Sequence, residues 1–173
     1  MIITVAGSAG SGKTTLAEGL ARELGYRHIS AGSIMRQMAS ERNMRLLEFS
    51  EYAERHPEVD REIDERQRRE AKGDCVVDGR ISAHFIDSDL KIFLTAPLEV
   101  RARRVSVRDK TRDPEDAILG REASERKRYK GIYGIDLEDL MIYDIILNTE
   151  HWDIPGTLEI VLAAVRGMKD GKK

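Results

Sequence analysis

The sequence has little of what several large protein classes require. Cys75 is the only cysteine, so an internal disulfide is excluded. Its neighbours Val76 and Val77 are apolar, which predicts a buried and unreactive thiol. No apolar run approaches the roughly 20 residues that a membrane helix needs, and no basic and then apolar signal segment opens the chain. We therefore expect a cytoplasmic protein with no membrane partner.

The chain also lacks a net charge that would attract one kind of partner. Its formal net charge is −2, although charged residues make up 35% of it. Because acidic and basic residues are interleaved and there are only five tyrosines and one tryptophan, we expect no nucleic-acid partner. A polyanionic ligand must therefore be captured by a local cluster of arginine and lysine. The length of 173 residues fits one domain, which we expect to act as a monomer.

Short apolar runs alternate with helical patterns along the chain. The run 2–6 is continuous and partly β-branched, which is typical of a strand covered on both faces. A glycine-rich turn follows, and leucines at four-residue spacing then predict a helix over 14–24 that ends at Gly25. Further strands are predicted at 26–30, 75–78, 90–95 and 144–147, and further helices at 33–72 (broken near Asn43 and at Pro57), 97–107 and 155–168. This alternation predicts an α/β fold with a parallel sheet, in which a ligand lies beyond the carboxyl ends of the strands.

Two stretches of the chain are dominated by charge. Residues 57–72 are almost wholly charged, with Val59 and Ile63 on one side, and predict a solvated helix with opposite charges three and four residues apart. Residues 108–135 are rich in arginine, lysine, glutamate and aspartate and contain few large apolar residues. We expect this second stretch to contribute little core and to form a mobile, partly helical flap.

Residues 7–14 (GSAGSGKT) match the pattern G-x-x-x-x-G-K-[ST], with a predicted strand before them and a predicted helix after them. Glycines let the backbone turn tightly, so that consecutive N–H groups point inward as an anion nest at the positive end of a helix. Lys13 can reach the β- and γ-phosphates of a nucleotide, and Thr14 can place its hydroxyl on Mg²⁺. The residues predicted to bind ATP are Gly7, Ser8, Ala9, Gly10, Ser11, Gly12, Lys13, Thr14 and Thr15.

A magnesium ion held by one hydroxyl needs further oxygen ligands. Asp78 ends the third predicted strand, and its carboxylate could hold a metal-bound water; the alternative is a turn-forming Asp-Gly pair. Histidine contributes nothing recognisable to this site, and we expect each histidine to be structural or exposed. These histidines are His28, His56, His84 and His151.

The arginines indicate which kind of phosphate-binding protein this is. The base-reading N-K-x-D segment of a GTPase is missing, and the D-x-x-G match at 153–156 follows the last strand, where it could not serve as a switch. Arg36 follows the second predicted strand and Arg80 follows the third. The predicted flap adds Arg121, Arg126 and Arg128. Since guanidinium groups make bidentate contacts with phosphate, this pattern predicts two phosphate clusters brought together; surface ion pairing is the alternative for each arginine.

Longer segments resemble the nucleoside monophosphate kinases, and most closely the archaeal-type cytidylate kinases. The resembling segments are 31–43, 48–67, 76–80, 96–104, 121–136 and 142–154. Together they span essentially the whole chain, and the blocks 48–67 and 121–148 are far more specific than the phosphate loop. The chain departs from the family pattern at Ser33, where an acidic residue is frequent, and at Ala9, where proline is common.

The resemblance implies a three-layer P-loop fold with a five-stranded parallel sheet flanked by helices. The core would comprise 1–31, 73–107 and 136–173, with a monophosphate-binding helical insert at 32–72 and a lid at 108–135. The implied reaction is transfer of the γ-phosphate of ATP to CMP or dCMP, with Mg²⁺ as the cofactor. Two rival functions are left open: a kinase for another monophosphate such as UMP or AMP, and a nucleotide-hydrolysing regulatory module.

Site roles follow from the resemblance position by position. Arg36 and Arg80 would grip the phosphate of the acceptor. The implied catalytic residues, which stabilise the transferring group, are Lys13, Arg121 and Arg128. Asp64 and Gln67 lie three residues apart on one predicted helix face and could read the cytosine edge; a solvated helix face is the alternative.

Overall fold

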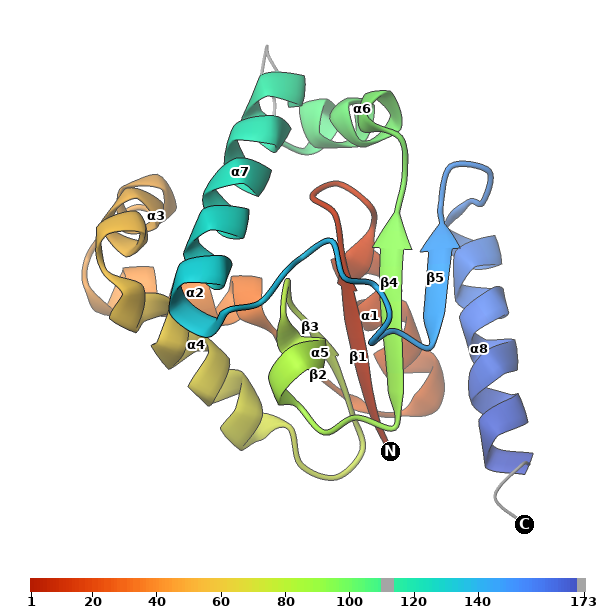
Figure 1. Cartoon of the computed structure of the whole chain (residues 1–173). Helices are drawn as coiled ribbons and strands as arrows, with labels where there is room; N and C mark the ends of the chain where they lie inside the picture. The colour runs from red at the N-terminus through yellow and green to blue at the C-terminus, as the bar shows by residue number, and fades with distance from the viewer. Residues whose placement is uncertain (110–113, 171–173) are drawn as a thin grey trace.

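Residues 1–109 and 114–170 are described by a computed structural model of the chain. Within these residues, five parallel strands form one sheet in the order β2-β3-β1-β4-β5 (Figure 1). The strands are β1 (Ile2–Gly7), β2 (Arg27–Ser30), β3 (Cys75–Asp78), β4 (Leu90–Thr95) and β5 (Ile145–Asn148). The predicted parallel α/β sheet is confirmed, and the central position of β1 places the phosphate loop at the middle of the sheet's carboxyl edge.

Helices connect the strands and cover both faces of the sheet (Figure 1). They are α1 (Lys13–Leu24), α2 (Ala31–Glu41), α3 (Leu46–Arg55), α4 (Pro57–Glu70), α5 (Ser82–Phe85), α6 (Leu98–Asp109), α7 (Pro114–Tyr133) and α8 (Ile154–Asp170). None of the helices in the described part of the chain is long and apolar enough to span a membrane.

Alternate side chains of the strands supply two cores on opposite faces of the sheet. On one face, Ile3 and Val76 lie in a cluster with Leu20 of α1 and Val161 of α8. On the other face, Val77 packs with residues of α2, α3 and α4. The three-layer architecture expected from the sequence is therefore confirmed.

Local sequence signals explain where several elements begin and end. α1 ends at Gly25, which adopts φ 68° and lets the chain leave the helix in the left-handed region. α2 begins after Ser30, whose hydroxyl accepts a hydrogen bond from the amide of Ser33 at 3.4 Å. The predicted break near Asn43 is confirmed by its positive φ of 54°, and Pro57 begins α4 as predicted.

One prediction about the charged stretches needs correction. The helix α4 is not merely solvated, because Val59, Asp60, Ile63 and Gln67 are all buried. In the second charged stretch, expected to be partly helical, the described residues contain α7, a continuous helix of 20 residues, and positions 110–113 lie outside the described residues. Charge alone was a poor guide here, since long helices bury individual charged residues against a neighbour when each has a partner.

Candidate active site

The phosphate loop leaves β1 at Gly7, where the backbone of β4 comes very close. A Cβ atom at position 7 would lie 2.1 Å from the carbonyl oxygen of Leu94, so this position accepts only glycine. The same carbonyl accepts a hydrogen bond from the Ser8 amide at 3.1 Å. Gly12 precedes α1 with φ 99°, a conformation that glycine adopts without strain. The loop therefore has the strand–turn–helix geometry that an anion nest requires.

Lys13 is the first residue of α1 and points back over the loop. Its Nζ donates a hydrogen bond to the carbonyl oxygen of Ser8 at 2.9 Å. Burial lowers the pKa of Lys13 to about 7, and the positive charge of Arg80 acts in the same direction. The amine is thus held inside the loop in a setting that disfavours its charge until an anion arrives.

Thr14 and Asp78 lie together, as a shared metal site requires. The hydroxyl of Thr14 donates a hydrogen bond to Oδ2 of Asp78 at 2.8 Å, and Asp78 is buried at the carboxyl end of β3. These are hard oxygen ligands, which suit Mg²⁺, and two protein oxygens leave most coordination positions to water and phosphate. Within the described residues no cluster of three or more histidine, cysteine or carboxylate side chains could hold a metal by itself. The residues present therefore fit a magnesium ion delivered together with a nucleotide.

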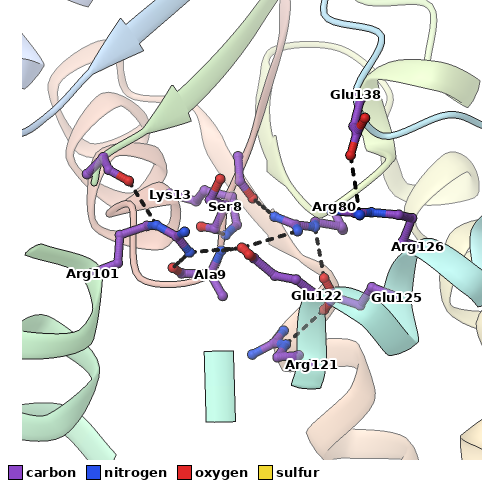
Figure 2. A network of polar contacts seen from close by, with 12 residues as sticks. Ser8, Ala9, Lys13, Arg80, Arg101, Arg121, Glu122, Glu125, Arg126 and Glu138 are labelled. Atoms are coloured by element: carbon purple, nitrogen blue, oxygen red, sulfur yellow. Dashed lines mark hydrogen bonds and ion pairs between the residues drawn. The ribbon is translucent and has the colours of Figure 1, made fainter. Parts of the chain in front are cut away.

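Two of the predicted arginines meet at one buried carboxylate of α7 (Figure 2). Oε2 of Glu125 lies 2.8 Å from Nε of Arg80, and Oε1 lies 2.8 Å from Nε of Arg121. Burial alone would raise the pKa of Glu125, but Arg121 and Arg80 outweigh it and hold the pKa below its usual range. Arg80 also donates a hydrogen bond to the carbonyl oxygen of Gly7. Glu125 thus joins a strand-end arginine to a helix arginine directly above the phosphate loop.

A second carboxylate of α7 binds the loop itself. Oε1 of Glu122 accepts a hydrogen bond from the amide of Ala9 at 3.2 Å and another from Nη1 of Arg101 at 2.9 Å (Figure 2). Arg101 lies on α6, is 8% exposed and also donates to the carbonyl oxygens of Ala9 and Ala96. The amide of Ala9 is one of the loop N–H groups expected to bind phosphate, and in this structure it donates to the carboxylate of Glu122 instead.

Further toward its C-terminus, α7 contacts the segment between β2 and β3. Nε of Arg128 lies 3.5 Å from Oδ2 of Asp60, and the hydroxyl of Tyr133 donates a hydrogen bond to Oδ2 of Asp64 at 2.6 Å. Burial raises the pKa of Asp64 to about 6. Arg128 and Arg121 thus serve different contacts here: Arg121 faces the carboxylate above the loop, and Arg128 faces α4.

The two remaining predicted acceptor residues lie in different surroundings. Arg36 is exposed on α2 and donates a hydrogen bond to the hydroxyl of Ser33 at 2.9 Å. Gln67 is 1% exposed, and its Nε2 donates to the carbonyl oxygen of Asp78 at 3.0 Å. Gln67 and Asp64 therefore do not share an open face: Gln67 anchors α4 to β3, and Asp64 faces α7.

A cavity of about 630 Å³ opens on the side of the phosphate loop toward β5. Arg104 and Trp152 contribute to its walls, and Arg104 donates to both the hydroxyl and the carbonyl oxygen of Thr149 at 2.8 Å. The hydroxyl of Thr149 in turn donates to the carbonyl oxygen of Ser11 in the loop at 3.1 Å. A smaller cavity of about 300 Å³ is lined in part by Arg80, Glu122 and Arg126.

Sequence reasoning missed several residues of this site, among them two glutamates of α7, an arginine of α6 and a histidine of β2. They are His28, Arg101, Glu122 and Glu125. Each has a partner at least 21 positions away along the chain, and Glu125 in addition binds Arg121 four positions before it. The signal that could have found the two glutamates was their placement one turn apart among the arginines of a helix.

Comparison with known proteins agrees with this geometry. The profile of a family described as "Cytidylate kinase-like family" matches residues 2–151. The cytidylate kinase of Methanocaldococcus jannaschii is 48% identical over 178 residues, covering 98% of this chain and 99% of that protein. The cytidylate kinase of Pyrococcus abyssi is 50% identical over 171 residues, covering 95% of this chain and 93% of that protein.

Solved structures confirm the fold at much lower sequence identity. Shikimate kinase from Bacteroides thetaiotaomicron superposes with a TM-score of 0.63 at 18% identity, covering 96% of this chain and 98% of that chain. Shikimate kinase from Aquifex aeolicus gives a TM-score of 0.62 at 19% identity, covering 99% of each chain. From the family profile and the relatives near half identity, we conclude that this chain belongs to the cytidylate kinase-like family.

Proposed function

We propose that this protein is a kinase that transfers the γ-phosphoryl group of ATP to CMP or dCMP, giving ADP and CDP or dCDP. The observation that carries the proposal is the convergence of Lys13, Arg80 and Arg121 on one side of the phosphate loop. Hydrolysis alone requires one phosphate cluster, whereas transfer between two nucleotides requires two to be neutralised at once. The relatives named cytidylate kinases, near half identity over almost the whole chain, supply the acceptor's identity.

The donor would lie with its phosphates in the loop and its base in the larger cavity. The loop amides and Lys13 would hold the β- and γ-phosphates, and the wall at Arg104 and Trp152 would contact the nucleoside. Thr14 and Asp78 would hold Mg²⁺, which when bound neutralises charge on the phosphate oxygens. The remaining loop positions would bind through their backbone.

The acceptor would lie on the other side of the loop, between the helical insert and α7. Arg80 and Arg36 would bind its phosphate, and Asp64 and Gln67 remain the proposed contacts to its base. For Gln67 this requires that its buried amide release the carbonyl of Asp78 or act through its remaining oxygen. In this proposal 32–72 is the acceptor-binding insert and 108–135 the lid.

Transfer itself would need alignment and charge neutralisation more than proton removal. The attacking oxygen belongs to a phosphate with a second pKa near 6, so it is already largely ionised at neutral pH and no general base is required. It attacks the γ-phosphorus in line, and the bond from that phosphorus to the bridging oxygen of ADP breaks. Lys13, Arg80, Arg121 and Arg128 would stabilise the charge, and α7 lying against the loop would exclude water.

A coupled assay of ADP release tests the proposal directly. With ATP and Mg²⁺ present, kcat/KM is measured for CMP, dCMP, UMP and AMP, alongside hydrolysis of ATP without any acceptor. We expect CMP or dCMP to give the highest kcat/KM, far above the hydrolysis rate. A preference for AMP or UMP would change the acceptor, and hydrolysis as fast as transfer would contradict a kinase altogether.

A further inference from the structure

His28 on β2 binds the buried carboxylate that faces Thr14. Its Nε2 lies 2.7 Å from Oδ1 of Asp78, while Oδ2 of Asp78 accepts the hydroxyl hydrogen of Thr14 at 2.8 Å. The two oxygens of one carboxylate are thus held separately, one by each neighbour. A carboxylate without a proton only accepts hydrogen bonds, so a hydrogen bond to it requires the tautomer of His28 that has its proton on Nε2.

The register of the sheet explains why His28 contacts Asp78, which lies 50 positions away in sequence. β2 and β3 are parallel, with Ser30 beside Asp78 and His28 beside Val76. Residues two apart on a strand share a face, and partners in register share it as well. His28 therefore lies on the same face of the sheet as Asp78, on the neighbouring strand and level with Val76, two residues before Asp78. Its ring is long enough to cross the strand spacing of roughly 4.8 Å.

We propose that His28 is a positioning residue for Asp78 in the binding of Mg²⁺·nucleotide. By holding Oδ1, the imidazole prevents the carboxylate from rotating about its χ2 bond and keeps Oδ2 directed at Thr14 and at the water shell of a cation. The inference rests on the proposed function only in placing Mg²⁺ at Thr14 and Asp78. Hydrogen bonds that orient a ligand typically change metal affinity about 10–100-fold when they are removed.

A purely structural role for His28 is the competing explanation. A buried carboxylate needs a hydrogen-bond partner in any case, and losing one would lower stability without any effect on metal binding. The two roles differ in what they do to the Mg²⁺ dependence of nucleotide binding, compared with nucleotide binding in EDTA.

The chain offers a substitution series and a matched control for this test. His28→Gln keeps an N–H donor at about the reach of Nε2, whereas His28→Leu removes it with little change of volume. A second histidine–carboxylate pair joins His56 and Glu58 at the same 2.7 Å, away from the phosphate loop. His56→Leu therefore removes a comparable contact without touching Asp78.

ADP is titrated into each full-length variant in EDTA and at a series of Mg²⁺ concentrations, with Trp152 fluorescence and calorimetry as readouts. Trp152 is the only tryptophan, and it lines the larger cavity while remaining 48% exposed. We expect His28→Leu to require about tenfold more Mg²⁺ for the same gain in ADP affinity, with ADP affinity in EDTA unchanged. His28→Gln and His56→Leu should follow the wild-type Mg²⁺ dependence.

The inference is overturned if His28→Leu keeps the wild-type Mg²⁺ dependence, or if ADP binding in EDTA weakens by the same factor as binding in Mg²⁺. An ADP affinity of the wild type that does not change with Mg²⁺ concentration would overturn the inference as well. Should His28→Leu not fold, His28→Asn replaces it, because its shorter amide does not reach Asp78. Failure of the proposed function is distinguishable: absent CMP phosphorylation with an intact Mg²⁺ effect at His28 would reject the reaction and keep the inference.

Discussion

The amide of Ala9 in the phosphate loop donates a hydrogen bond to Oε1 of Glu122 on α7, at 3.2 Å. In the proposed reaction this amide faces the polyphosphate, so the carboxylate and the phosphate compete for the same donor. We therefore expect nucleotide binding to displace Glu122, which would remove the carboxylate partner of Arg101 and leave its hydrogen bonds to the carbonyl oxygens of Ala9 and Ala96.

Glu122→Gln should strengthen nucleotide binding and lower the stability of the protein without ligand. The amide keeps the shape of the side chain but removes the charge that competes with phosphate, so we expect ADP to bind about fivefold tighter, roughly 1 kcal/mol. The melting temperature without ligand should fall, because Arg101 loses a charged partner. Glu115→Gln, an exposed position on the same helix, is the control, and equal or weaker ADP binding by Glu122→Gln would contradict the competition.

Lys13→Ala and Arg121→Ala should each abolish most turnover with the fold intact. Loss of the loop lysine removes charge stabilisation worth at least about a hundredfold in kcat, and loss of an arginine over the transferring group costs about a thousandfold. Steady-state rates are measured beside circular dichroism spectra. Lys127→Ala on the exposed side of α7 is the control, and near wild-type rates in either variant would reject the assigned roles.

Nucleotide binding should take up a proton at Lys13. Burial and Arg80 hold the pKa of Lys13 near 7 in the free protein, whereas a bound polyphosphate favours the charged amine and raises it. At pH 8.5 ADP is fully ionised, so the uptake of about one proton per ADP would come from the lysine, and affinity should fall about tenfold per pH unit above 7. Calorimetry in two buffers of different ionisation enthalpy measures this; Lys13→Arg stays charged and should show no uptake, and a wild type without uptake would contradict the shift.

Asp64 should make stability depend on pH near 6. Its pKa is raised from 3.8 to about 6, so its contribution to stability is fully present below 3.8 and is lost as pH rises through 6. Asp64→Asn retains an acceptor for Tyr133 and cannot ionise, so its melting temperature should exceed that of wild type by a few degrees at pH 7.5 and by less at pH 5. Asp116→Asn, exposed on α7, controls for net charge, and a pH-independent difference would argue against burial as the cause.

Much of the fold was predictable because the strands are short apolar runs bounded by residues that favour turns. β3 and β4 were predicted with their observed ends, and β5 was displaced by a single residue. The helix α5 (Ser82–Phe85) was missed, because four residues are too few to show a helical period.

The site was predictable only where one motif carried the chemistry. The phosphate loop is one contiguous motif, and Asp78 ends a strand. The parallel topology places both at the same edge of the sheet, where the hydroxyl of Thr14 lies 2.8 Å from Oδ2 of Asp78. His28 belongs to no constellation that the sequence shows, because its partner lies 50 positions away and their contact depends on which strand neighbours β2. Arg101 was missed for a related reason: a helix arginine looks solvated until the loop it binds is placed beside it.

The close approach of Gly7 to β4 has a consequence for how such sequences change over time. The atom that any larger residue would add meets main chain of the central sheet, and Gly7 also adopts φ 148°, so the sheet and the backbone turn at its edge together require glycine. A descendant that had lost all affinity for nucleotides would still keep this glycine as long as it kept the sheet. The first glycine of the motif is therefore a record of architecture, and the information about chemistry lies further along the loop.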